Sequence, residues 1–254
     1  MLVTVLDLIS DLDGLLRPAA FDDYAPNGLQ VPGPEEVGTV ATGVSASVEL
    51  FERAAAEGAQ LVLVHHGLFW QGMAQHVDRQ LYRRLRPLFL NDMALAAYHL
   101  PLDAHPEVGN NALIARGLGC ERLEPFAEHR GEPIGVAGTF GGDGMEAAEL
   151  VERVRSLTGR DPLHLAFGPE RVRTIGIVSG GAAGYLDDAI AAGHDAFLTG
   201  EPAERVLAQS REAHVHFLAA GHYATETFGI RALGDRLAER FGVRHVFIDD
   251  PNPI

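Results

Sequence analysis

The apolar run Leu61–Val64, followed at once by two histidines, is the sequence feature that most restricts the fold. Four consecutive apolar residues bounded by polar ones predict a strand buried on both faces, as parallel sheets require. A short β-branched segment at 37–44 precedes it, and between the two lies a helical stretch that Ser45 or Ser47 would cap and Gly58 would end. This part of the chain is therefore predicted to form a β-α-β unit.

The same alternation of helices and strands continues along the chain. An amphipathic helix is expected between Leu2 and Leu16, and the remaining elements are expected as helices near 77–89, from Asn110 or Asn111, near 145–157 and near 224–241, with strands near 93–98, 172–178, 196–198 and 215–218 and a last one through Phe247. These elements predict an α/β fold of two lobes with mainly parallel sheets and a metal site between them at the carboxyl ends of the strands.

The boundary between the lobes is expected where the sequence becomes rich in Gly, Pro and charge, between Glu121 and Gly144. The predicted lobes are residues 1–125, with His65, His66 and Asp103, and residues 126–254, with His222 and Glu226. The C-terminal segment is expected to pack back on the first lobe.

Charge and composition exclude several functions. The chain has 46% apolar and 22% charged residues, typical of a globular protein, and its formal net charge of −15 makes non-specific binding to nucleic acid or anionic lipid unfavourable. All 20 basic residues are Arg, so no lysine Schiff base or lysine general base is available. A catalytic base must then be a histidine or a carboxylate.

Localisation is predicted to be cytoplasmic. Cys120 is the only cysteine, which excludes intrachain disulfides and Cys-rich metal sites and fits a reducing compartment. The first 16 residues lack a basic region followed by an apolar core, and no stretch approaches 18 apolar residues, so we expect neither a signal peptide nor a membrane span.

Histidines and carboxylates follow three of the predicted strands. His65 and His66 end the first strand, Asp103 lies just after the strand near 93–98, and His222 and Glu226 stand four residues apart where a helix begins. Ligands collect at the carboxyl ends of parallel strands, and side chains at i and i+4 share one helix face. Taken singly, each has a structural explanation: a hydrogen-bonded strand end, an Asx turn, or a carboxylate facing a helix dipole. Together they predict a metal site.

The histidine pair predicts two ions. Adjacent side chains on a strand point to opposite sides, so one ion can hardly bind both His65 and His66, whereas two neighbouring ions can bind one each. Two divalent ions bring +4 and Asp103 with Glu226 bring −2, so the site should keep open positions for water or an anionic substrate, as catalytic sites do. Imidazole with carboxylate suits Zn, Fe, Mn or Ni.

Other residues are candidates for catalysis and anion binding. His99 and Glu201 follow predicted strands and are candidate acid–base groups. Glu201 can instead support a metal ligand from behind, or serve as a helix cap. Gly180 and Gly181 lie between a strand and a helix and form a possible anion loop, or else a tight turn that lets the two elements approach.

The whole set of motifs resembles one known family, the GTP cyclohydrolase I type 2 homologues, also called dinuclear metal centre hexameric proteins, in their short bacterial branch. The matching motifs are His65-His66-Gly67, the segment from His99 to Asn111, Thr199-Gly200-Glu201, Gly221 to Glu226, Asn27-Gly28-Leu29-Gln30 and Asp250-Pro251-Asn252-Pro253. The resemblance implies that His66 and Asp103 bind one metal, that His65 and His222 bind the other, and that Glu226 bridges them. It also implies a toroidal homohexamer.

The leading functional hypothesis is therefore a dinuclear metal-dependent hydrolase that acts on a nucleotide, GTP by the family name, or on a related anionic small molecule through a metal-activated water. Phosphoester or amide hydrolysis is the second enzymatic interpretation. The alternative from another class is a non-enzymatic, metal-binding hexameric ring or adaptor protein.

Overall fold

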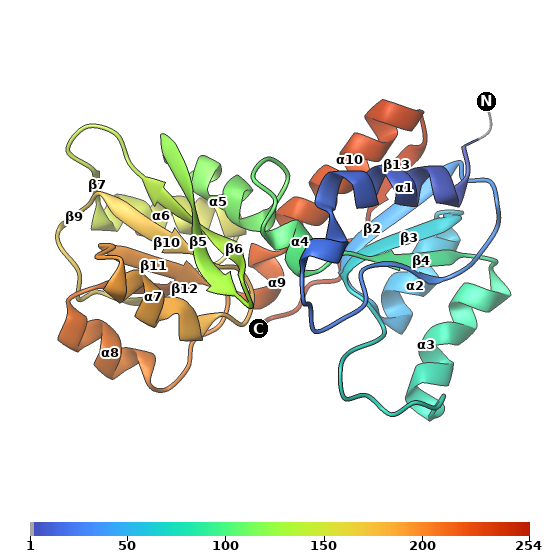
Figure 1. Cartoon of the computed structure of the whole chain (residues 1–254), viewed down its shortest axis with the longest axis horizontal. Coiled ribbons are helices and arrows are strands. Elements are labelled where there is room, and N and C mark those ends of the chain that lie inside the picture. Colours follow the sequence, from blue (N-terminus) through green and yellow to red (C-terminus); the bar gives the residue numbers. More distant parts are fainter. Residues whose placement is uncertain (1–2) are drawn as a thin grey trace. The chain divides into compact units, whose positions relative to one another are not determined.

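The structure is a computed structural model that describes residues 3–254, so Met1 and the predicted contribution of Leu2 to the first helix lie outside the described residues. The chain divides into two compact units (Figure 1). Unit 1 comprises residues 1–102 and 229–250, and unit 2 comprises residues 103–228 and 251–254. The predicted division at residue 125 differs from these bounds: 103–125 belong to unit 2, and 229–250 return to unit 1.

Unit 1 contains a five-stranded sheet in the order β1-β4-β3-β2-β13. Its elements are α1 (Val5–Leu16), η1 (Pro18–Ala20), β1 (Gly28–Val31), β2 (Thr39–Ser45), α2 (Val48–Ala56), β3 (Leu61–His66), α3 (Arg79–Leu90), β4 (Ala94–Ala97), most of α4 (Leu100–Asp103), most of α10 (Thr227–Phe241) and β13 (Arg244–Phe247). Strands β13, β2, β3 and β4 are parallel, and β1 pairs antiparallel with β4 at one edge.

The central strand of this sheet is buried as its sequence predicts. All four residues of Leu61–Val64 are 0% exposed. Helices α2 and α3 lie on one face of the sheet, and α1 and α10 lie on the other (Figure 1). Ser47 caps α2, since its hydroxyl accepts a hydrogen bond from the N–H of Leu50 at 3.0 Å, and Gly58 follows the helix with a φ of +68°. The predicted β-α-β unit is thus present.

Unit 2 contains a six-stranded sheet in the order β5-β6-β10-β11-β12-β8. Its elements are α5 (Asn110–Leu118), β5 (Arg122–His129), β6 (Glu132–Thr139), β7 (Met145–Glu146), α6 (Ala147–Thr158), β8 (Leu163–Leu165), β9 (Arg171–Val172), β10 (Thr174–Ile177), η2 (Ala183–Tyr185), α7 (Leu186–Ala191), β11 (Ala196–Thr199), α8 (Val206–Ala213), β12 (His216–Ala219) and α9 (His222–Thr225). Strands β10, β11 and β12 are parallel, and the strands that flank them are antiparallel.

The α/β class and the two lobes are confirmed. The region expected as a boundary, Glu121 to Gly144, instead forms the hairpin β5–β6. The strand expected near 172–178 is divided into β9 and β10, and the helix expected near 224–241 is divided into α9 and α10. Among residues 3–254, no helix has the length and apolar character needed to span a bilayer.

Candidate functional site

His65 lies at the carboxyl end of β3 and is fully buried. Its Nδ1 is 2.9 Å from the carbonyl oxygen of Tyr98, which follows the neighbouring strand β4. A carbonyl only accepts, so Nδ1 carries the proton and donates it, and Nε2 carries the lone pair that a metal ion binds. This contact gives the ring the tautomer and the orientation of a metal ligand.

The Nδ1 atom of His66 is contacted by a residue of β2, the strand that flanks β3 on the side away from β4. Ser45 pairs with His66 in the register of β2 and β3, and its hydroxyl lies 3.0 Å from Nδ1 of the half-buried His66 ring. The ring of Trp70 lies 5.8 Å from it, centroid to centroid. As with His65, the Nδ1 contact holds the ring and orients its Nε2.

His99 follows β4 and is held by Asp23, a buried carboxylate 76 residues away in sequence. Its Nδ1 donates to Asp23 Oδ1 at 2.7 Å, while Asp23 Oδ2 accepts the N–H of Leu100 at 3.0 Å and the amide of Asn27 at 2.9 Å. Burial alone raises the pKa of Asp23, but these contacts, led by His99, outweigh burial and lower the pKa below its ordinary value. Asp23 is therefore an ionised acceptor that fixes the His99 ring.

The three rings of unit 1 form one donor cluster. His65, His66 and His99 each offer a ring nitrogen, and these atoms lie within 4.8 Å of one another. The ring centroids of His65 and His66 are 4.7 Å apart, and those of His65 and His99 are 5.1 Å apart. Three imidazoles at this spacing can hold a metal ion, so unit 1 brings His99 next to the predicted histidine pair.

In unit 2, His222 and Glu226 lie together as their spacing predicts. His222 opens α9, and its Nε2 is 3.1 Å from Oε2 of Glu226, which is 3% exposed. The Nδ1 of the same ring forms an ion pair with Glu201, which follows β11. Burial lowers the pKa of His222, but the hydrogen bonds and charges of Glu226 and Glu201 outweigh burial and raise the pKa to about 9.

Asp103 lies close to Glu226. It is 6% exposed, and its Oδ1 accepts the amide of Asn110 at 2.8 Å and the hydroxyl of Ser179 at 3.1 Å. Carboxylate oxygens of Asp103 and Glu226 lie within 4.8 Å of each other. A carboxylate has about four lone-pair sites, so Asp103 keeps the capacity to bind a cation beside these two hydrogen bonds.

Glycines at the ends of β10 and β11 make room for these side chains. A Cβ at Gly180 would lie 2.2 Å from Oε1 of Glu226 and 3.2 Å from Nε2 of His222, and the φ of Gly180 is +67°. A Cβ at Gly200 would lie 2.7 Å from the carbonyl oxygen of Gly180. Only glycine fits either position, because any side chain there would displace the neighbouring loop or the two ligands.

The possible anion loop at Gly180 and Gly181 uses its backbone groups internally. The N–H of Gly180 donates to the hydroxyl of Thr225 at 3.1 Å, and the N–H of Ala182 donates to the hydroxyl of Thr199 at 3.2 Å. With the Glu226 carboxylate against Gly180, this loop is a poor place for an anion, and anion binding there stays a prediction.

Glu201 was a sequence candidate, but sequence reasoning did not find four other side chains that orient candidate site residues: Asp23, Ser45, Asn110 and Ser179. The sequence predicts Ser45 as a helix cap, and Asn110 as a helix start and as part of a family motif, without a role for either beside a ligand. The spacing of strands and ligands carries no signal for these partners, because each comes from a different segment. The donor chemistry of both clusters, imidazoles with fixed Nδ1 contacts and buried carboxylates, fits a divalent transition metal.

Known proteins resemble this chain over its whole length. A family model described as Duf34/NIF3 (NGG1p interacting factor 3) matches residues 3–253. The GTP cyclohydrolase 1 type 2 homolog of Pseudomonas aeruginosa is 46% identical over 253 residues, covering 100% of both chains, and that of Escherichia coli is 44% identical over 242 residues, covering 94% of each.

Solved structures of similar proteins share this fold. One described as protein ybgI, of unknown function, has a TM-score of 0.93 with 41% identity and covers 99% of this chain and 100% of its own. The protein TTHA1606 from Thermus thermophilus has a TM-score of 0.90 with 38% identity and covers the same shares. The match to the family model and the identity to these relatives confirm the predicted resemblance, and the chain belongs to the Duf34/NIF3 family.

Proposed function

We propose that this protein is a hydrolase that uses two divalent metal ions and acts on a nucleotide or a related anionic small molecule. Under this proposal His66 and Asp103 bind one ion, His65 and His222 bind the other, and Glu226 bridges them. The curated relatives are named for GTP cyclohydrolase 1 type 2, which suggests a nucleotide substrate.

The observation that carries the proposal is the way the candidate ligands are oriented. His65, His66 and His222 each have Nδ1 in contact with an oxygen atom of another segment. Metal-binding histidines characteristically use one ring nitrogen for such a contact and the other for the ion. Histidines that were only solvated would not each need a protein partner at Nδ1.

The position of Glu226 supports its bridging role. Its carboxylate lies 3.1 Å from Nε2 of His222 and within 4.8 Å of a carboxylate oxygen of Asp103, two residues assigned to different ions. A single carboxylate can bind two cations through its two oxygens. When bound, the ions would supply Lewis acidity and lower the pKa of a water molecule near neutrality.

His99 and Glu201 are the two candidates for transferring the proton of that water. Asp23 holds Nδ1 of His99 at 2.7 Å, so His99 offers Nε2 as the acceptor, an arrangement that catalytic histidines share. Glu201 contacts Nδ1 of His222 instead, so we assign Glu201 the role of orienting that ligand. His99 is then the preferred acid–base residue of the two candidates.

The experiment that tests the proposal combines metal content with turnover. Protein purified without chelator should hold more than one divalent ion per chain, and a maximum of one would contradict the dinuclear assignment. Alanine at His65 or His222 should empty mainly one position, and alanine at His66 or Asp103 mainly the other. The exposed His76 provides the matched control, since His76→Ala should change neither.

Turnover separates the enzyme from the alternative. A panel of nucleotides, phosphoesters and amides is assayed with and without added metal, using the same preparations. We expect metal-dependent hydrolysis of at least one anionic substrate and its loss in the ligand variants. No turnover of any compound, with full metal occupancy, would favour the non-enzymatic ring or adaptor.

A further inference from the structure

Arg160 lies beside the start of α9, where the candidate ligand His222 stands. It follows α6 and precedes β8, which pairs antiparallel with β12 so that Leu163 is opposite Ala219. Continued three residues past the strand, this pairing brings Arg160 level with His222. The side chain confirms the placement: a Cβ at Gly221 would lie 2.5 Å from one guanidinium nitrogen of Arg160 and 2.9 Å from its Cζ.

Gly221 permits this approach in two ways. Its φ is +97°, which residues with side chains rarely adopt, and even a methyl group would push the guanidinium away. The N–H of Gly221 donates to the carbonyl of Gly200 at 2.9 Å, which positions this backbone. The guanidinium is therefore seated directly against the backbone that carries His222.

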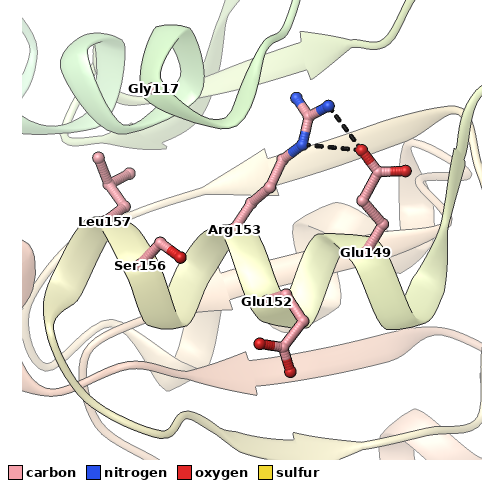
Figure 2. A pocket seen from close by; sticks show the side chains of 6 residues that line it. All are labelled: Gly117, Glu149, Glu152, Arg153, Ser156 and Leu157. Atoms are coloured by element: carbon pink, nitrogen blue, oxygen red, sulfur yellow. Dashed lines mark hydrogen bonds and ion pairs between the residues drawn. The ribbon is translucent and has the colours of Figure 1, made fainter.

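Arg160 is the one arginine of residues 103–228 that is not exposed. Its guanidinium also forms no hydrogen bond or ion pair with another described residue. Arg153 on α6 is an arginine whose donors have protein acceptors: two of its nitrogens donate to Glu149 at 3.1 and 2.6 Å (Figure 2). A third donates to the carbonyl of Leu118 at 2.8 Å. A half-buried group with five donors and no protein acceptor is suited to an acceptor that comes from outside the chain.

The positive charge of the Arg160 guanidinium indicates which chemical class of acceptor it would bind. A guanidinium binds oxyanions through two parallel N–H···O bonds, and it does so most strongly where water is partly excluded. At Gly180 the nearby Glu226 carboxylate is unfavourable for an anion, whereas Arg160 places a permanent positive charge next to His222.

We propose that Arg160 binds an oxyanion group of the substrate, a phosphoryl or a carboxylate group, and thereby selects anionic substrates. This inference rests on the proposed function, because it takes the metal ligands around His222 as the reaction site. It adds a binding residue that lies outside the metal ligands.

The test uses the metal-loaded full-length protein with inorganic phosphate and acetate as probes, and it measures their binding by calorimetry, without any turnover. Arg160→Gln should weaken binding of at least one probe tenfold or more, and Arg160→Lys should fall between the two, because it keeps the charge and loses the paired donors. Arg173→Gln is the matched control. Arg173 is exposed and precedes β10, at the edge of the same sheet that is opposite to His222. This variant should bind both probes as the wild type does.

The outcomes separate this inference from the hydrolase proposal. Weaker phosphate binding alone identifies a phosphoryl group, weaker acetate binding alone a carboxylate, and weaker binding of both the shared oxyanion chemistry. Any of these supports Arg160 even if no compound is hydrolysed. Unchanged affinity for both probes in Arg160→Gln, with unchanged metal content and circular dichroism, would overturn it even if turnover is found. Should Arg160→Gln fail to fold, wild-type affinity in Arg160→Lys would overturn it as well.

Discussion

Replacing Glu226 by Gln should be the most damaging isosteric change in the candidate metal site. The other proposed ligands each serve one ion, whereas this carboxylate would serve both. Glutamine keeps the shape but removes the charge, and it offers one good acceptor oxygen where two are needed. Loss of a group that only orients a ligand costs about 10- to 100-fold in metal affinity, so loss of a charged ligand should cost about 100-fold or more for each ion, or about 2.7 kcal/mol.

The metal-free protein should respond much less. At an effective dielectric constant of about 20, Glu226 attracts a protonated His222 ring 3.1 Å away by about 5 kcal/mol. It is repelled by Asp103, which lies within 4.8 Å, by at least about 3.5 kcal/mol. The substitution removes both terms, so the free energy of unfolding at pH 7 should change by only about 2 kcal/mol or less. Above pH 9 His222 loses its proton, the repulsion alone remains, and Glu226→Gln should become the more stable protein.

One preparation of each protein serves for all the measurements. Metal content is determined by elemental analysis, metal affinity by competitive titration against a chelator, and unfolding by urea with and without chelator at pH 7 and pH 10. Retention of two ions at wild-type affinity would refute the bridging role. Global unfolding of the metal-free variant at pH 7 would show that Glu226 holds the fold together and would favour the adaptor over the hydrolase.

Four further predictions concern the pH dependence of metal affinity, the pH dependence of stability, the buried Asp23 and assembly. Because metal binding must displace a proton from His222, whose pKa is about 9, affinity should rise about tenfold per pH unit from pH 7 to 9 and then level off; a flat profile would exclude His222 as a ligand. In the metal-free protein the same raised pKa adds stability that is complete below about pH 6.5 and is lost as the pH rises through about 9, which urea unfolding across that range will detect. Asp23→Asn should lower the free energy of unfolding by about 1–3 kcal/mol, since an amide NH₂ would face the N–H donors that the carboxylate accepts; equal urea midpoints would contradict this. By family resemblance, light scattering should give a mass near six times 27.3 kDa, and a monomer at all concentrations would contradict the hexamer.

Much of the fold is predictable because its central strands are simple apolar runs. The strand Leu61–Val64 and the parallel strands of unit 2 can be recognised in the sequence as continuous apolar runs, which the fold buries. Neighbouring helices can be recognised by capping residues such as Ser47. The hairpin β5–β6 was missed because its strands contain Pro125, Pro133 and Gly135 and many charges, which locally favour turns. Its pairing with β10 places it in the sheet despite this composition.

The candidate site shows the same limit. The position of ligands after strands follows from a rule of parallel sheets, so His65, His222 and Glu226 were within reach of the sequence. The partners that orient them depend on which segments meet in the folded chain. Asp23 contacts His99 across 76 residues and Ser179 contacts Asp103 across 76 residues, and no local pattern records either pairing.

The way unit 1 is assembled from both parts of the chain has a consequence for biosynthesis. Residues 103–228 form nearly all of unit 2 and can fold while the ribosome is still translating, but β2 lacks its neighbour β13 until residues 244–247 have emerged. Until then β2 is the edge of a nascent, largely apolar sheet, and such edges recruit other chains into aggregates. Translation that stops within α10 should therefore yield a protein whose unit 2 is folded and whose unit 1 is prone to aggregation. Such a protein should bind chaperones.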